Sequence, residues 1–297
     1  MAEAIREGMR SSGDKCDIAR LKDISPWELA GYDLIGLGSP VINQREPPNI
    51  SEFIEQGLKS VDGKHAFAFC THGASPCRYL ANVVPAMAQR GLVVIGWNDW
   101  FCSAYYPTIP KPYFTDRHPD AIDLKEAEDF GREMAKRSRK IYQGETKLIP
   151  VFPKGKEYDE LYEPPEAWPW AFPEVIEYGK VMHSTPFIIN KEKCLYPKCS
   201  YCIDNCPAHN IGHTTSGPVY HDNCAYCYLC EQTCPRGAIK TDYETLEKAH
   251  YKMVKTWLKK SIDVFEARGK LRRLVPDKDI GWDTAFWKNK PPRFKIV

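Results

Sequence analysis

The chain has 297 residues, of which 43% are hydrophobic and 27% are charged, so it is long enough for a sizeable core and for two compact domains. Its 41 Lys and Arg residues nearly balance its 39 Asp and Glu residues, which argues against nucleic acid or an anionic membrane as the main partner. The start, MAEAIREGMR, lacks the apolar core of a signal peptide, and no apolar run approaches the roughly 20 residues of a membrane span. We therefore expect a cytoplasmic protein without a membrane span.

The first part of the chain alternates short β-rich runs with helical patterns. Gly, Pro or polar residues close each β-rich run, and the runs cover residues 16–21, 32–40, 65–73 and 92–97. Helical periodicity covers residues 49–61, 76–90 and about 119–142, and Asn49 with Glu52 is spaced as a capping box. Strands that alternate with helices of this length predict a parallel sheet covered on both faces.

Such a sheet binds ligands beyond the carboxyl ends of its strands. The loops expected there cover residues 38–48, 71–77 and 98–107. Thr71 and the loop amides can hydrogen-bond the polar edge of a flat ring. The face of the ring can stack on aromatic side chains of the same region, namely Trp97, Trp100, Tyr105 and Tyr106. Alternatively, these aromatic side chains fill the rim of the sheet or a domain interface.

Four segments resemble the flavodoxin-like half of flavodoxin–ferredoxin fusion proteins: AEAIREGM, YDLIGLGSPV, FCTHGASP and HPDAIDLKEAEDFGREMA. The resemblance implies that flavin mononucleotide (FMN) is a candidate cofactor, held by the loops that begin at Ser39 and Thr71. With the nearby indole, the predicted flavin contacts are Ser39, Pro40, Val41, Asn43, Thr71, His72, Gly73 and Trp100.

The sequence departs from this family at its start. Family members begin with a strand and a Ser/Thr-rich phosphate loop, whereas this sequence begins inside the helix that follows. The missing strand is an interior one, so we expect unpaired edges beside residues 16–21 and 32–38. Two explanations stay open: the true start lies upstream, or this member lost flavin phosphate binding.

Residues 144–186 connect this region to the next. They contain seven prolines, which exclude long helices and central strands. They also contain Trp168, Trp170 and Phe172, which a flexible linker would not carry. We expect an ordered strap that packs on one or both domains or on a partner.

Eight of the twelve cysteines lie between Cys194 and Cys234, and a disulfide framework is not expected in the cytoplasm. The first run has the spacing C-x4-C-x2-C-x3-C-P, and the second has C-x2-C-x2-C-x3-C-P. The last three cysteines of the first run lie 28 residues before their counterparts, whereas 30 residues separate Cys194 from Cys224. The two runs look like one duplicated unit with two residues inserted after Cys194.

This spacing favours cubane iron–sulfur clusters, because a tight loop directs three thiolates at one cluster and the distal cysteine of the other run supplies the fourth. The predicted sets are Cys194, Cys199, Cys202 and Cys234 for one [4Fe-4S] cluster, and Cys224, Cys227, Cys230 and Cys206 for the other. Zinc is the alternative, but it does not need a third cysteine in each run. Residues 187–240 resemble a bacterial-type ferredoxin with two [4Fe-4S] clusters, which implies two short hairpins, two short helices and electron transfer at low potential.

The C-terminal pattern predicts an amphipathic helix over about 243–268. Its lysines form either a solvated face or a docking patch for an acidic redox partner. Cys70 and Cys77 flank the loop at Thr71, either as a redox-active pair or as small buried residues. No hydrolytic motif of the G-x-S-x-G or H-E-x-x-H type occurs.

The predicted fold is an α/β flavodoxin-like parallel sheet, incomplete at its start, followed by an α+β ferredoxin-like domain. The predicted limits are 1–143 for the first domain, 144–186 for the strap, 187–242 for the ferredoxin-like domain and 243–297 for the C-terminal helix and tail. We expect an electron-transfer protein, or an oxidoreductase subunit of anaerobic metabolism, that serves redox partner proteins. The alternatives are a flavin-dependent reductase with its own organic substrate, and a degenerate flavodoxin scaffold that docks the ferredoxin module.

Overall fold

The structure is a computed structural model that describes residues 1–58 and 61–289. The chain divides into two compact units. The first unit comprises Met1–Ser103 and Arg117–Pro164, and the second comprises Ala104–Asp116 and Pro165–Val297. In chain order, the α-helices and strands are α1 (Ala2–Arg10), β1 (Leu34–Pro40), α2 (Pro48–Gly57), β2 (His65–His72), α3 (Tyr79–Gln89), β3 (Val93–Phe101), α4 (Ala121–Tyr142), α5 (Lys156–Tyr162), α6 (Pro173–Ser184), β4 (Ile188–Ile189), α7 (Tyr201–Asp204), β5 (Ile211–Thr214), β6 (Gly217–Tyr220), α8 (Leu229–Thr233), β7 (Ile239–Lys240), α9 (Tyr243–Met253) and α10 (Lys259–Ala267).

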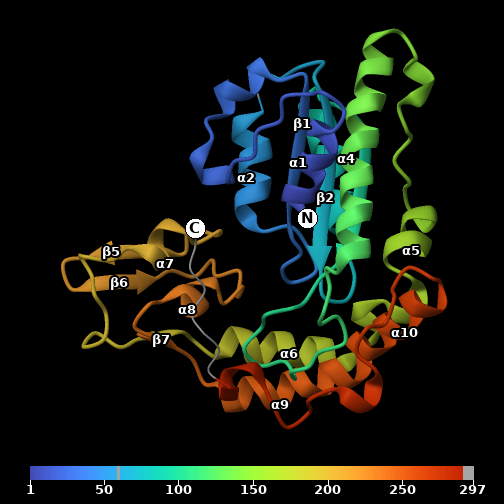
Figure 1. The fold of residues 1–297 in the computed structure, drawn as a ribbon. Helices are drawn as coiled ribbons and strands as arrows, with labels where there is room; N and C mark the ends of the chain where they lie inside the picture. The colour runs from blue at the N-terminus through green and yellow to red at the C-terminus, as the bar shows by residue number, and fades with distance from the viewer. Residues whose placement is uncertain (59–60, 290–297) are drawn as a thin grey trace. The chain divides into compact units, whose positions relative to one another are not determined.

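The first unit is built on a parallel sheet with the strand order β1-β2-β3. Successive side chains of β2 point to opposite faces, as the pleat requires. Ala66 and Ala68 face the side covered by α2 and α3, whereas Phe67 and Phe69 face the side covered by α1 and α4 (Figure 1). The parallel sheet predicted from residues 32–40, 65–73 and 92–97 is therefore confirmed, with helices on both faces.

The β-rich run at residues 16–21, the first of the four in the chain, does not form a strand. Residues 16–20 have no regular structure, and a short 3-10 helix follows at Leu21–Asp23. A strand gains its stability from a hydrogen-bonded neighbour, and β1 pairs only with β2 among the described strands. The prediction of a strand over residues 16–21 was wrong because local β-propensity does not supply that neighbour.

Two helix starts show how local chemistry sets the boundaries. Helix α2 begins at Pro48 with Pro47 as its N-cap, so Asn49 and Glu52 lie inside the helix and the predicted capping box was wrong. Helix α4 does have a capping box: the carboxylate of Asp120 accepts from the amide of Asp123, and the side chain of Asp123 accepts from the amide of Asp120.

The second unit contains two small antiparallel pairs, β4 with β7 and β5 with β6. Two short helices, α7 and α8, lie within the two cysteine runs. The predicted C-terminal helix runs from Tyr243 to Ala267, with one π-helical turn at Val254–Leu258 between α9 and α10. The expected fold class, an α/β parallel sheet followed by a smaller α+β region, is confirmed.

The strap is ordered and divides between the units. Tyr158 packs in the core of the first unit, where its ring lies 5.7 Å from that of Phe152. In the second unit, the indole Nε1 of Trp257 donates to the carbonyl oxygen of Ala167 at 2.8 Å. The chain passes from the first unit to the second at Pro164.

Residues 104–116 belong to the second unit, although they directly follow β3 and Ser103. The hydroxyl of Thr108 and Nδ1 of His250 form a buried hydrogen bond of 2.7 Å. The ring of Tyr106 lies edge-on to that of Tyr228, with 5.7 Å between centroids. Tyr106 therefore packs within the second unit, as does Tyr105, whose ring lies edge-on to that of Phe286.

Candidate metal centre and flavin loops

The first predicted set of cysteines lines one small cavity in the second unit. Its volume is about 20 Å³, and Ile189 and Ile239 also line it. All four thiols are partly buried. The structure thus brings together, from both runs, Cys194, Cys199, Cys202 and Cys234.

The second set is identified by electrostatic proximity. Burial raises the pKa of Cys224, Cys227 and Cys230, and the nearby Cys206 raises each of them further. These effects raise the pKa of Cys227 to about 12. Cys206, from the first run, is therefore close enough to interact electrostatically with all three of these cysteines of the second run.

The duplication seen in the sequence reappears in the backbone around the two distal cysteines. The amide of Asn210 donates to Sγ of Cys206 at 3.3 Å, and the amide of Ala238 donates to Sγ of Cys234 at 3.2 Å. Each donor follows its cysteine by four residues. Such N–H···S bonds stabilise a thiolate, so the loops are suited to hold anionic sulfur.

The two sets of cysteines are compared with the needs of the two metal centres that the sequence left open. Among residues 1–58 and 61–289, no group of three or more His, Cys, Asp or Glu side chains is arranged to hold one metal ion. Tetrahedral zinc draws every sulfur to about 2.3 Å from one centre. A [4Fe-4S] cluster takes one thiolate at each of its irons, so its cysteines lie further apart.

Burial of these thiols has a consequence for metal loading. Desolvation, followed by the nearby Cys234, raises the pKa of Cys202 to about 11. Cysteine binds metal as the thiolate, so binding of iron displaces the protons from such thiols. In the metal-free protein, burial thus favours the protonated thiol. The N–H groups that bond to Cys206 and Cys234 favour the thiolate.

Tyr220 is a neighbour of the cysteines that sequence reasoning missed. Its hydroxyl lies 3.3 Å from Sγ of Cys230, within hydrogen-bonding distance. Burial raises the pKa of Tyr220, and the adjacent Cys230 raises it further. The hint available in the sequence was the position of Tyr220 four residues before Cys224, but only the hairpin register shows where its side chain points.

The two loops predicted to hold a flavin lie side by side in the first unit. The amide of Val41 donates to the carbonyl oxygen of Thr71 at 2.8 Å, which extends the pairing of β1 and β2 into the loops. The amide of Arg78 donates to the carbonyl oxygen of Gln44 at 3.0 Å. The loop residues of the predicted set are thus neighbours: Ser39, Pro40, Val41, Asn43, Thr71, His72 and Gly73.

Helix α5 of the strap is tied to the second of these loops. The hydroxyl of Ser75 donates to the carbonyl oxygen of Tyr162 at 2.9 Å, and Arg78 forms an ion pair of 3.0 Å with Glu163. Residues 74–77 are buried. The strap therefore occupies part of the loop surface that the sequence assigned to a ligand.

Two residues of the predicted flavin set are buried. Trp100 is only 4% exposed and packs edge-on against Phe69 and Phe130 in the core beneath α1 and α4, so it does not fit a stacking role. Nε2 of His72 bonds to the carboxylate of Asp99 at 2.9 Å. Nδ1 of His72 is buried and has no hydrogen-bond partner among the described side chains and backbone.

Cys70 and Cys77 are both buried. Desolvation raises the pKa of Cys77 to about 12 and raises that of Cys70 as well. A thiol that is inaccessible and protonated is a poor nucleophile. Their positions match the alternative that treats them as small core residues.

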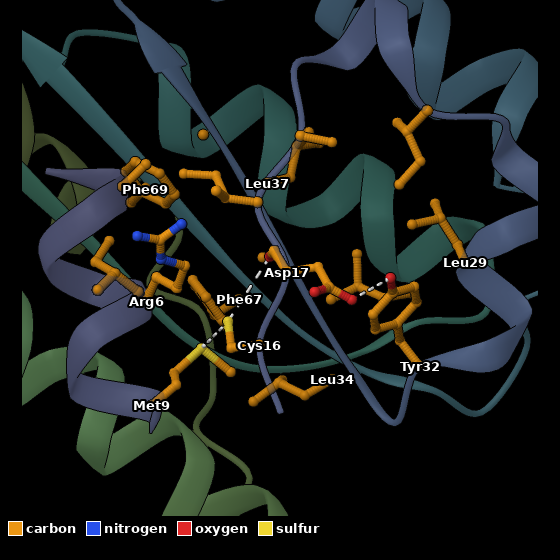
Figure 2. Close-up of a pocket in the computed structure, with 18 of the residues that line it drawn as sticks. Arg6, Met9, Cys16, Asp17, Leu29, Tyr32, Leu34, Leu37, Phe67 and Phe69 are labelled. Atoms are coloured by element: carbon orange, nitrogen blue, oxygen red, sulfur yellow. Dashed lines mark hydrogen bonds between the residues drawn. The ribbon is translucent and has the colours of Figure 1, made fainter. Parts of the chain in front are cut away.

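One cavity of the first unit lies beside β1, at the edge opposite β2. Its volume is about 250 Å³, and Figure 2 shows it between α1, β1 and the irregular residues 15–21. Apolar side chains dominate the lining, including Met9, Leu37, Phe67 and Phe69. A Cβ atom on Gly36 would lie 2.3 Å from the ring of Phe67, so glycine at this point of β1 lets the ring extend toward the cavity.

The rim of this cavity is held by polar contacts from residues 16–17. The hydroxyl of Tyr32 donates to the carboxylate of Asp17 at 2.8 Å, and Sγ of Cys16 lies 3.6 Å from the sulfur of Met9 (Figure 2). The unpaired edge expected beside residues 32–38 is thus present at β1, where a cavity takes the place of a neighbouring strand.

No family model matches the chain. Among curated proteins, a NAD(P)H dehydrogenase (quinone) of Acidovorax ebreus is 26% identical in an alignment 184 positions long, which covers 48% of this chain and 92% of that protein. An uncharacterized ferredoxin of Methanocaldococcus jannaschii is 34% identical over 58 residues, which are 19% of this chain and 94% of that protein. Both similar proteins bear the names of redox proteins.

Among solved structures, an archaeal flavodoxin covers 46% of this chain and 87% of its own, with 20% sequence identity and a TM-score of 0.38. The chain joins a unit with a three-stranded parallel sheet between helices to a cysteine-rich region with small antiparallel sheets, and 19% of the chain is similar to the ferredoxin named above. None of the described helices has the length and apolarity needed to cross a membrane.

Proposed function

We propose that this protein transfers single electrons through two [4Fe-4S] clusters, held by the two crossed sets of cysteines. The observation that carries this proposal is the grouping itself, in which each set takes three cysteines from one run and the distal cysteine from the other. The duplicated N–H···S bonds to Cys206 and Cys234 support it. Bound clusters would supply the one-electron chemistry, and the chain would supply thiolates, hydrogen bonds and partial exclusion of water.

Anaerobic purification followed by iron, acid-labile sulfide, zinc and flavin analysis tests this proposal. Two cubane clusters require about eight iron and eight sulfide per chain. Two zinc ions without sulfide would contradict it. Flavin content is a separate result of the same preparation, because FMN at the paired loops remains a candidate and the clusters do not depend on it.

A reductase with its own organic substrate is the second candidate. The observation that favours it is the similarity of about half the chain to a protein named as a quinone-reducing NAD(P)H dehydrogenase. Anaerobic assays of the pure protein with NADH or NADPH, or with a reduced dye, and a quinone separate the candidates. Quinone reduction that is faster than the uncatalysed reaction of the reductant with the quinone supports a reductase. No such acceleration in a sample with intact clusters supports an electron carrier.

The partners we propose are redox proteins, as donor and acceptor or as subunits of a larger oxidoreductase. The lysines of α9 and α10 are a weak basis for docking, because two of them are ion-paired within the unit: Lys252 with Glu177 at 2.6 Å and Lys259 with Asp263 at 2.7 Å. They match the alternative of a solvated face with local ion pairs. A cytoplasmic location remains part of the proposal.

A further inference from the structure

The two halves of the cysteine-rich region differ at one position of their antiparallel pairs. Ile211 of β5 pairs with Tyr220 of β6, and Ile239 of β7 pairs with Ile189 of β4. Ile211 and Ile239 are separated by the 28-residue repeat, so Tyr220 and Ile189 occupy equivalent places. One half thus has a phenol where the other has an aliphatic side chain.

The side-chain hydrogen bond of Tyr220 reaches only the second set, although Cys202 of the first set also lies near enough to raise the pKa of Tyr220. The hydroxyl of Tyr220 lies 3.3 Å from Sγ of Cys230, in the second set. Ile189 lines the cavity formed by the first set. An isoleucine has no donor, so the repeat places a side-chain hydrogen bond at one set and an apolar contact at the other.

The direction of this hydrogen bond follows from the chemistry of the proposed centre. A thiolate bound to iron carries no proton, so the phenol is the donor and sulfur is the acceptor. The ring of Tyr220 is fixed by stacking on Phe187, with 5.5 Å between centroids and 22° between planes. The hydroxyl is therefore held in place toward Cys230.

We propose that Tyr220 is a positioning residue that makes the two clusters electronically unequal, with the higher midpoint potential at the cluster ligated by Cys230. This rests on the proposed function. Reduction adds one electron to the cluster, and its charge is spread over the thiolate sulfurs. A donor aimed at such a sulfur stabilises the reduced form more than the oxidised form. The cluster of the second set is then the one on which a single electron rests.

The test is a redox titration of the anaerobic holoprotein followed by EPR, comparing the unaltered protein with Tyr220→Phe. The cluster signals are assigned with Cys206→Ser, which perturbs the second set. In Tyr220→Phe we expect a lower midpoint potential for the second cluster, whose ligand Cys230 loses a hydrogen bond, and a smaller change for the first. Iron and sulfide contents are measured on every sample, so loss of clusters is distinguished from a failure of this inference.

Tyr226→Phe is the matched control. Tyr226 lies on the second cysteine run and packs 6.4 Å from Phe187, but the contacts described for its side chain include no hydrogen bond to a cysteine. The control should leave both potentials unchanged. An unchanged second potential in Tyr220→Phe with full iron content overturns the inference, as does an equal shift in Tyr226→Phe.

A second substitution covers the case in which Tyr220→Phe fails to assemble the second cluster. Replacement of Tyr220 by 3-fluorotyrosine keeps the ring and the hydroxyl but makes the phenol a stronger donor. The midpoint potential of the second cluster should then rise. A fall or no change would overturn the inference.

Discussion

The amide of Asn210 donates a hydrogen bond to Sγ of Cys206 at 3.3 Å. This bond holds the last cysteine of the first run beside the three clustered cysteines of the second run. Its equivalent, from Ala238 to Cys234, holds the last cysteine of the second run in the first set. The distal cysteines therefore connect the two halves, so damage at one run is expected to affect the cluster held mainly by the other.

The substitution Cys206→Ser should damage the cluster held mainly by residues 224–230 and leave the first cluster assembled. The serine hydroxyl is a poorer ligand for iron than a thiolate. We expect iron content to fall toward half and EPR to retain the signal of the first cluster. Cys16→Ser, which alters a cysteine of the first unit, should keep the full iron content. Loss of the first cluster in Cys206→Ser would contradict the crossed arrangement.

Acid should destabilise the second unit through His250. This imidazole is fully buried, and desolvation lowers its pKa from 6.5 to about 3. The groups that face it are the hydroxyl of Thr108 and the rings of Tyr106 and Tyr178. Above pH 6.5 both the folded and the unfolded states hold a neutral imidazole. Below it only the unfolded state gains the proton, so stability falls by about 1.4 kcal/mol per pH unit.

Urea unfolding of the holoprotein at pH 7.5 and pH 5.5, followed by circular dichroism, measures this effect. His250→Gln removes the titrating group and should reduce the difference in unfolding free energy between the two pH values. His183→Gln, at an exposed histidine, should leave the difference unchanged. Equal pH dependence in His250→Gln and the unaltered protein would show that other groups dominate.

Trp100 should matter for stability and not for a ligand. Its indole is buried against Phe69 and Phe130, so Trp100→Ala should cost about 3–5 kcal/mol of unfolding free energy. Trp27→Ala is the control, because Trp27 is 72% exposed and its loss should change stability by less than about 0.5 kcal/mol. Full stability of Trp100→Ala together with a selective loss of bound flavin would instead support the stacking role.

Hydrogen exchange should distinguish the strands of the first unit. Strand β2 pairs on both sides, whereas β1 pairs with β2 alone among the strands of residues 1–58 and 61–289 and borders the cavity of about 250 Å³. Amides of β2 should therefore exchange most slowly, and several amides of β1 should exchange through local opening. Mass spectrometry of peptic peptides over residues 34–40 and 65–72 measures the difference. Equal protection of both strands would show that β1 has a partner along its free edge.

The parts of the fold that the sequence predicted are those encoded by short-range patterns. The β-rich run at residues 65–73 and the helical periodicity over about 119–142 need no information beyond their neighbours. The cysteine sets were predicted from spacing because ligation by four thiolates restricts the loops tightly. Their ligand roles remain a proposal, although their grouping is visible in the structure.

Other parts depend on contacts that no local pattern records. Residues 16–21 have the composition of a strand but no strand beside them. Trp100 was expected in a loop after the strand, yet it lies within β3, and its side chain packs in the core formed with α4. The sequence shows Tyr220 only as an aromatic residue before a cysteine run. The register of β5 and β6 places its hydroxyl beside Cys230.

The assignment of residues 104–116 to the second unit affects how the protein can be dissected. The chain crosses between the units at Ser103, Asp116 and Pro164, so no single cut yields both units complete. A fragment that begins at Pro165 would lack Thr108, the partner of His250, and would expose the face on which Tyr106 packs. A fragment that ends at Pro164 would carry apolar residues such as Ile109 and Phe114 without their partners. Separate expression of the two halves is thus expected to give aggregation-prone fragments, so experiments on either unit need the whole polypeptide.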